Sequence, residues 1–500
     1  MSFKSIAARL FAAHIHRKTA QWSNHPVRSQ QRVFDNLLSV AENTAFAKAH
    51  SFQNIKSHQD FVSQVPVRDY EDLKPFVDRV VAGESDVLWP GKPLYFAKTS
   101  GTTSGAKYVP LTKESMPEHI KAARNAILSY IHETGNSRFV DGKMIFLQGS
   151  PEMETQNGIQ LGRLSGIVAH YVPDYLQRNR MPSWETNCID DWETKVEAVI
   201  DETLPENMSV ISGIPSWLQM YFERIVQRTG KKVGEVFPDL SLLIYGGVNF
   251  EPYKAKFKSL IGRDIDSIEL FPASEGFFAY QDKQSEKGML LLLDAGIFYE
   301  FIPADQFHQE NPPRLTIADV EIGVNYVLII STTAGLWAYN IGDTIAFTSL
   351  QPFRVVVTGR IKHYISASGE HVIGKEVEEA MKAAVAQHGW IINEFTVAPQ
   401  LETPDGELPY HEWFVEMDEI PIQESLTVFK ATLDLEMRQQ NSYYDDLIKG
   451  KILQPLKIKI LKTGAFQHYM KSIGKLGGQN KLPRLSNDRK IAGFLEDYES

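Results

Sequence analysis

The chain has 500 residues, of which 43% are hydrophobic and 23% charged, so it holds enough apolar material for two or more globular domains. Its net charge of −10 argues against a nucleic-acid-binding protein, whose contact surface is basic. Cys188 is the only cysteine, which excludes an intramolecular disulfide, and no apolar run reaches the ~20 residues of a membrane span. We therefore expect a cytoplasmic protein with neither a nucleic acid nor a membrane as its partner.

The first 34 residues carry six basic side chains and no acidic one, a bias that is typical of mitochondrial transit peptides. The same segment also fits an amphipathic first helix of the folded protein, with Ile6, Leu10 and Phe11 on one face. Pro26 and the helical pattern after it lead directly into a domain, which favours the helix.

Helical and strand patterns alternate along the first two thirds of the chain, which is typical of an α/β fold. The helical patterns cover residues 30–48, 113–133, 191–203, 215–229 and 374–388. Apolar runs with strand character lie at 144–148, 241–247, 268–274, 324–332 and 354–360. Residues 289–303 are expected to form a pair of strands around a turn at Asp294–Ala295–Gly296.

A domain boundary is expected near Thr358–Gly359–Arg360, because the pattern restarts after it as strand, helix and strand. Residues 403–406, with the sequence TPDG, predict a turn within this second part. The prediction is a large N-terminal domain of mixed sheets and helices at 1–358, followed by a small α+β domain at 359–500.

The segment AKTSGTTSGAKYVPLT at 97–112 looks suited to phosphate binding, because every residue at 99–105 is Ser, Thr or Gly. Glycines let the backbone approach an anion, and successive N–H groups with hydroxyls form an anion-binding nest. Lys107 adds a positive charge, although the Walker A pattern does not fit the segment. A flexible surface loop is the alternative, but a preceding apolar run and Pro110 at the exit favour the phosphate site.

This loop resembles the phosphate-binding loop of the adenylate-forming superfamily, which includes acyl-CoA synthetases, luciferases and nonribosomal adenylation domains. Four further segments resemble the superfamily's motifs in the required order: YGGVNFEP at 245–252, FPASEG at 271–276, TTAGLWAYNIGDTIAF at 332–347 and GRIKHYISASGEHVIGKEVEEAM at 359–381. Within the superfamily, the chain is most similar to bacterial relatives of the auxin-responsive acyl acid–amido synthetases. VRDYEDLKPFVDRV at 67–80 and KLPR at 481–484 carry that similarity, which covers most of the chain.

The resemblance implies a binding site for ATP and Mg²⁺. The loop residues that would hold the β- and γ-phosphates are Ser100, Gly101, Thr102, Thr103 and Ser104. The residues expected around the adenine are Gly246, Gly247, Phe271, Ala273 and Ser274, with Phe271 stacking where the family usually has tyrosine.

Three charged residues complete the implied nucleotide site. Asp343 would accept hydrogen bonds from the ribose hydroxyls, and Arg360 would contact the ribose or the α-phosphate. Glu275 would bind Mg²⁺, which prefers one or two carboxylates together with phosphate oxygens. Taken alone, Glu275 fits a surface glutamate and Asp343 fits a turn residue.

The C-terminal part would supply a hinge at Lys362, about which the small domain rotates between two half-reactions. It would also supply a catalytic lysine, for which Lys481 in the Lys-x-Pro-Arg element is favoured over Lys475 and Lys471. Trp217 and Trp337 would close the pocket for the acyl group, although simple core packing explains both tryptophans equally well.

The function implied by the resemblance is ATP-dependent activation of a carboxylic acid as an acyl-adenylate, followed by transfer to an amine, expected to be an amino acid. One alternative is an acyl-CoA ligase, which makes the same adenylate but transfers to a thiol. A second alternative is a non-catalytic adenine-nucleotide sensor. The presence of Glu275, Asp343, Arg360 and a lysine near 481 argues against the sensor, which does not need groups that assist pyrophosphate departure.

Overall fold

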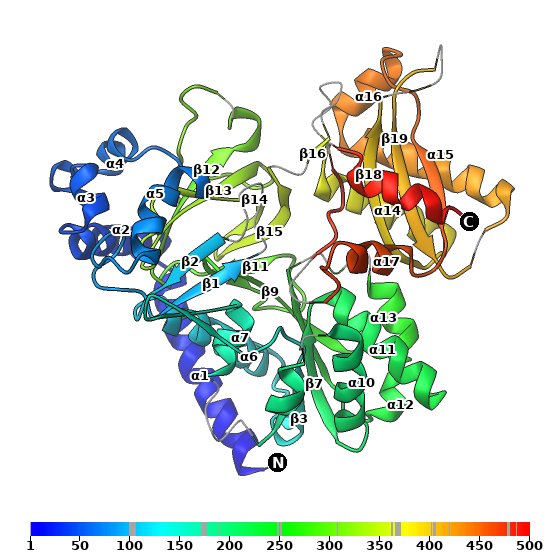
Figure 1. The fold of residues 1–500 in the computed structure, drawn as a ribbon, viewed down its shortest axis with the longest axis horizontal. Coiled ribbons are helices and arrows are strands. Elements are labelled where there is room, and N and C mark those ends of the chain that lie inside the picture. Colours follow the sequence, from blue (N-terminus) through cyan, green and yellow to red (C-terminus); the bar gives the residue numbers. More distant parts are fainter. Residues whose placement is uncertain are drawn as a thin grey trace. The chain divides into compact units, whose positions relative to one another are not determined.

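The computed structural model describes residues 2–500 apart from 100–106, 172–177, 190, 248–249, 251–252, 308, 362–363, 366–371, 402, 404–406, 420, 478–480 and 487. The chain divides into two compact units, which are drawn in Figure 1. Unit 1 comprises Met1–Gly247 and Asp264–Val356, and unit 2 comprises Val248–Arg263 and Val357–Ser500. The segment 248–263 groups with unit 2, whereas the sequence placed it in the first domain. Mobility of the second domain stays a prediction.

Unit 1 is built on an 11-stranded sheet, which confirms the α/β class. In spatial order its strands are β12 (Ile297–Pro303), β13 (Asn325–Thr332), β14 (Tyr339–Leu350), β15 (Phe353–Arg360), β11 (Met289–Leu291), β10 (Gly276–Tyr280), β9 (Asp266–Ala273), β8 (Leu242–Gly246), β7 (Met208–Gly213), β3 (Lys143–Phe146) and β6 (Arg180–Met181). Strands β3, β6, β7, β8 and β9 pair in parallel. Parallel strands need cover on both faces, which explains why β8 is a continuous apolar run.

A second, four-stranded sheet of unit 1 has the order β2 (Lys107–Leu111), β1 (Tyr95–Thr99), β5 (Ile159–Gly162) and β4 (Glu154–Gln156). The helices of unit 1 are α1 (Phe3–Ser23), α2 (Pro26–Ala41), α3 (Ala45–Ala49), α4 (His58–Gln64), α5 (Tyr70–Val81), α6 (Met116–Thr134), α7 (Leu164–Ala169), α9 (Trp184–Asn187), α10 (Trp192–Thr203), α11 (Pro215–Thr229) and α12 (Val233–Val236). Proline at the first turn starts α2 and α11, and glycine with a positive φ ends α6 and α11.

Unit 2 contains the three-stranded sheet β18 (Ile392–Gln400), β19 (Tyr410–Met417) and β20 (Lys457–Leu461). A short pair, β16 (Tyr364–Ile365) and β17 (Val372–Ile373), precedes it in the chain. Its helices are α13 (Lys254–Ile261), α14 (Gly374–His388), α15 (Gln423–Gln440), α16 (Ser442–Lys449), α17 (Ala465–Ser472) and α18 (Lys490–Leu495). Trp413 and Phe395, both fully buried, stack at 5.8 Å in the core of this unit.

Two expectations about local structure need correction. The helix expected at 30–48 is two helices, because Thr44 caps a new helix at Ala45. The strands at 289–303 exist but do not pair with each other, since β11 lies between β10 and β15 whereas β12 pairs with β13. The predicted turn at 403–406 falls almost entirely outside the described residues.

The expected first helix is confirmed as α1. Ile6, Leu10 and Phe11 are exposed, whereas the buried side chains of α1 are Ser5, Ala12, Ile15 and Trp22. Among the residues that the structure describes, no helix has both the length and the apolar character needed to cross a membrane.

Candidate active site

Two predicted motifs meet at one edge of the large sheet. Strands β7, β8 and β9 run parallel, so their carboxyl ends at Gly213, Gly246 and Ala273 lie at the same edge. In open α/β sheets this edge is where ligands bind. The structure therefore brings the glycine segment after β8 beside the Ser274–Glu275 turn after β9.

Gly246 is required by close backbone packing between β8 and β9. A Cβ atom at this position would lie 2.6 Å from the carbonyl oxygen of Leu270, closer than real Cβ contacts allow. The next residue, Gly247, has φ of +91°, a conformation that other residues rarely adopt. The backbone geometry thus explains why glycine occupies both positions, and contact of these glycines with an adenine stays a prediction.

Glu275 lies in the tight turn between β9 and β10. Ala273 pairs with Gly276, so Ser274 and Glu275 form the whole connection, and the Glu275 side chain is half-buried. Phe271, two residues before Ala273 on β9, is 7% exposed and packs edge-on against Phe278 at 5.0 Å. An edge-to-face contact with another ring is typical of a core phenylalanine, and stacking of Phe271 on an adenine stays a prediction.

Asp343 is held by an irregularity in β14. Val327 pairs with Thr344 and Ile329 pairs with Asn340, so three residues of β14 stand opposite one residue of β13. Within this bulge Gly342 has φ of +87°, and its N–H donates to Oδ1 of Asn340 at 2.8 Å. Bulges commonly re-aim side chains beside functional sites, and here the bulge carries Asp343, which is 9% exposed.

The predicted phosphate loop, including Ser100 to Ser104, lies outside the described residues. The hairpin that carries it is described, and Thr99 pairs with Lys107 at its open end. The hydroxyl of Tyr70, from the VRDYEDLKPF segment, accepts a hydrogen bond from Tyr108 N at 2.9 Å. Lys107 Nζ also lies 5.3 Å from the Tyr70 ring centroid. The Tyr70 side chain thus fixes β2, a contact that sequence reasoning missed.

Arg360 and Lys362 were expected at the junction between the two domains. Arg360 is the last residue of β15 and is exposed, while Gly359 before it has φ of +147°. Lys362 lies outside the described residues. The roles of both residues stay predictions.

The segment that carries Lys481 is anchored by its neighbours. Pro483 O accepts from Thr396 Oγ1 at 2.8 Å, and Leu485 forms a parallel bridge with Val397 of β18. Arg484 donates to Glu378 at 3.1 Å and also to Glu394, with its side chain only 10% exposed. The sequence showed this segment only as the motif KLPR, and the buried ion pairs that hold it were not predicted.

Lys481 itself is exposed, three residues from the anchored guanidinium of Arg484. Lys475 is also exposed and lies in the turn after α17, where its N–H donates to Met470 O at 2.8 Å. The anchoring of the KLPR segment supports Lys481 as the better positioned of the two lysines, and neither role has been tested.

Trp217 and Trp337 have the contacts of core side chains. Trp217 is 2% exposed and packs on Trp192 with a centroid separation of 4.4 Å. Trp337 is 1% exposed, and its indole N–H donates to Leu88 O at 3.0 Å. These contacts match the packing alternative that the sequence left open, and contact with an acyl group stays a prediction.

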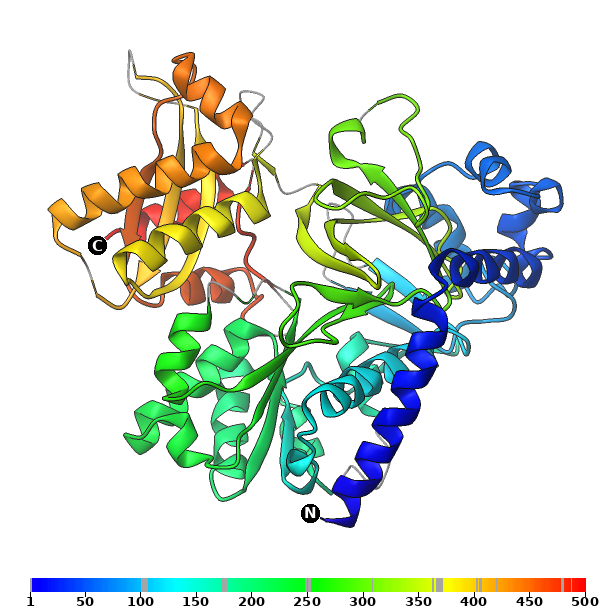
Figure 2. The same cartoon turned by 180° about the vertical axis from the view of Figure 1, so that it is seen from behind.

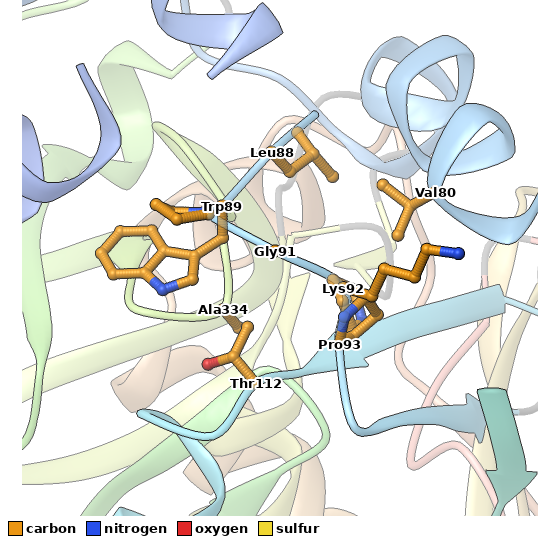
Figure 3. A pocket seen from close by; sticks show the side chains of 10 residues that line it. Val80, Leu88, Trp89, Gly91, Lys92, Pro93, Thr112 and Ala334 are labelled. Atoms are coloured by element: carbon orange, nitrogen blue, oxygen red, sulfur yellow. The ribbon is translucent and has the colours of Figure 1, made fainter. Parts of the chain in front are cut away.

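A shallow pocket lies in unit 1, between the segment before β1 and the loop after β13 (Figure 3). Its lining residues are Val80, Leu88, Trp89, Pro90, Gly91, Lys92, Pro93, Pro110, Thr112 and Ala334. Pro110 and Thr112 belong to the segment 97–112 and Ala334 to the segment 332–347, but none of the lining residues is among those expected to contact nucleotide or metal, so we do not assign the pocket to the active site.

The donor set at Glu275 fits Mg²⁺ rather than a metal caged by protein ligands. Over the described part of the chain, no group of three or more His, Cys, Asp or Glu side chains is placed to hold a metal ion. Mg²⁺ is usually bound by one or two carboxylates plus phosphate oxygens and water, which a single glutamate beside a bound triphosphate satisfies.

Comparison with known proteins adds independent evidence. Three family models match in order: the GH3 family N-terminal domain over residues 16–190, the central domain over 290–360 and the C-terminal domain over 375–490. Indole-3-acetic acid-amido synthetase GH3.3 of Arabidopsis thaliana is 21% identical over 553 residues, covering 93% of this chain and 90% of that protein.

Solved structures agree on the fold. GH3.15 acyl acid amido synthetase matches with a TM-score of 0.80 at 17% identity, covering 98% of this chain and 96% of that chain. A 2-hydroxyisobutyryl-CoA ligase in the postadenylation state matches with a TM-score of 0.62 at 13% identity, covering 95% and 92% of the two chains. From the three family models, matched in order along more than two thirds of its length, and from this shared fold, we conclude that the chain belongs to the GH3 family.

Proposed function

We propose that the protein uses ATP to activate a carboxylic acid as an acyl-adenylate, releasing pyrophosphate, and then transfers the acyl group to an amine. The reaction yields an amide and AMP, so the protein is an AMP-forming ligase. The observation that supports this most directly is the meeting of the Gly246–Gly247 and Ser274–Glu275 segments at one edge of parallel strands. That arrangement lies within a chain of the GH3 family.

In this proposal the chain's residues mainly position the reactants and offset negative charge, as is general for phosphoryl-type transfer. Asp343 accepts hydrogen bonds from the ribose hydroxyls, because an ionised carboxylate only accepts. Lys481 brings a positive charge to the oxygens between the acyl carbon and the α-phosphate. Glu275 would hold Mg²⁺, which would supply positive charge against the phosphates.

The acceptor in this proposal is an amine, such as an amino acid, rather than coenzyme A. The relatives that match over most of this chain are named acid-amido synthetases, and one GH3.15 structure is described as a complex with 2,4-DB. Attack requires the unprotonated amine, so the second half-reaction should accelerate as pH rises toward the pKa of the amine. The class of carboxylic acid that this chain activates must be identified with a panel of substrates.

The test is ATP–pyrophosphate exchange with Mg²⁺ and a panel of aromatic and aliphatic acids. We expect exchange that depends on an acid in the wild-type protein and is reduced at least ~100-fold in Glu275→Gln, since loss of a single electrostatic stabiliser commonly has that effect. Glu42→Gln, at an exposed glutamate that ends α2 beside β12 at the far end of the large sheet, is the matched control and should keep full exchange. Equal exchange by Glu275→Gln and wild type would remove Glu275 from the site, and no exchange with any acid would contradict the proposed activation step.

A further inference from the structure

Helix α1 has two apolar faces, although packing within unit 1 needs only one. Ala12, Ile15 and Trp22 are buried on the face toward the domain, where α1 lies alongside α6. On the opposite side Phe3, Ile6 and Leu10 recur at helical spacing and are 86%, 47% and 71% exposed. This row is defined here as the α1 stripe, and α1 is the dark blue helix of Figure 2.

The surroundings of the α1 stripe are basic within a chain of net charge −10. Lys4, Arg17 and Lys18 are exposed on α1, and the helix contains no acidic residue. Arg124 of α6 lies 5.3 Å from the ring centroid of Phe11, at the flank of the stripe. An exposed apolar row that ends among basic side chains is found in helices that lie in the plane of an anionic membrane surface.

We propose that the α1 stripe docks unit 1 on the surface of an anionic phospholipid membrane. The apolar side chains enter the boundary between headgroups and acyl chains, and Arg17 and Lys18 meet the negative headgroups. A second copy of the chain fits less well, because pairing two such helices brings like charges together with no acidic residue of α1 to offset them. The inference does not depend on the proposed reaction.

The test is co-sedimentation of the full chain with vesicles of phosphatidylcholine alone or mixed with phosphatidylglycerol. We expect binding to the anionic vesicles that weakens as salt is added. Phe3→Ser with Leu10→Ser should lower the partition coefficient at least ~10-fold by removing two large apolar groups. Arg17→Gln with Lys18→Gln should lower it about 25-fold, because each basic side chain near an anionic surface contributes about fivefold.

The matched control is Val428→Ser with Leu435→Ser on α15, where each residue is 54% exposed and the helix carries Glu424 and Glu436. These substitutions should leave vesicle binding unchanged, and circular dichroism should show that all variants keep their fold. Absence of binding to anionic vesicles would overturn the proposal, as would an equal loss in the α15 control. So would a wild-type dimer in analytical ultracentrifugation that Phe3→Ser with Leu10→Ser converts to a monomer.

Discussion

Replacing Arg484 by methionine should destabilise unit 2 and thereby displace the segment that carries Lys481. The guanidinium, with its side chain 10% exposed, bonds Glu378 and Glu394, whose side chains are 11% and 15% exposed. Removing one partner of a buried ion pair leaves the other charge poorly solvated, which generally costs about 3–5 kcal/mol. For a unit of this size, a loss of ~3 kcal/mol lowers the unfolding temperature by ~6–12 °C.

The assay is thermal unfolding of the full chain, with hydrogen exchange of peptides from α14 and β18 to identify the unit that opens. Lys490→Met is the control, because the Lys490–Asp488 pair has side chains that are 86% and 55% exposed. Such an exposed pair contributes at most ~1 kcal/mol to stability, so its loss should barely change the unfolding temperature. If Arg484→Met and Lys490→Met shift unfolding equally, the buried network does not anchor the KLPR segment as argued.

Two further predictions concern the catalytic lysine and a buried carboxylate. Lys481→Ala should abolish pyrophosphate exchange yet still form product from a supplied acyl-adenylate, whereas Lys475→Ala should retain exchange; the reverse pattern would assign the role to Lys475. Burial acts to raise the pKa of Glu300, but Arg314 and a hydrogen bond from His58 outweigh it, so its pKa lies below the ordinary value. The stability from this pair is therefore present above pH ~4.3 and lost as pH falls below it, and the difference in unfolding free energy between wild type and Glu300→Gln should shrink from pH 7 to pH 3. A constant difference would show that the pKa of Glu300 is the same in the folded and unfolded chain, which would contradict a lowered pKa.

The sequence predicted the class of the fold and most of the elements that carry the site. Apolar runs at 241–247 and 268–274 became adjacent parallel strands, because buried strands have a strong periodic signal. The pairing of β11 with β15 was missed, since a turn signal at 294–296 indicates a reversal of the chain but not the partner of each strand.

The identity of the site motifs came from their resemblance to a family, and their geometry came from the structure. The bulge that carries Asp343 depends on the register between β13 and β14, which local composition does not determine. The anchoring of Arg484 depends on Glu378 and Glu394, residues 106 and 90 positions away in the chain. The side of α1 that packs inward was not predicted, because both sides carry apolar residues and periodicity alone does not say which side is buried.

Product identification tests the central claim most directly. The full chain is supplied with ATP, Mg²⁺ and each acid that supports exchange, then with either a mixture of amino acids or coenzyme A, and products are identified by mass spectrometry. The proposed function predicts AMP together with an amide of the acid and one or more amino acids. A thioester with coenzyme A and no amide across the whole panel would contradict it and favour an acyl-CoA ligase.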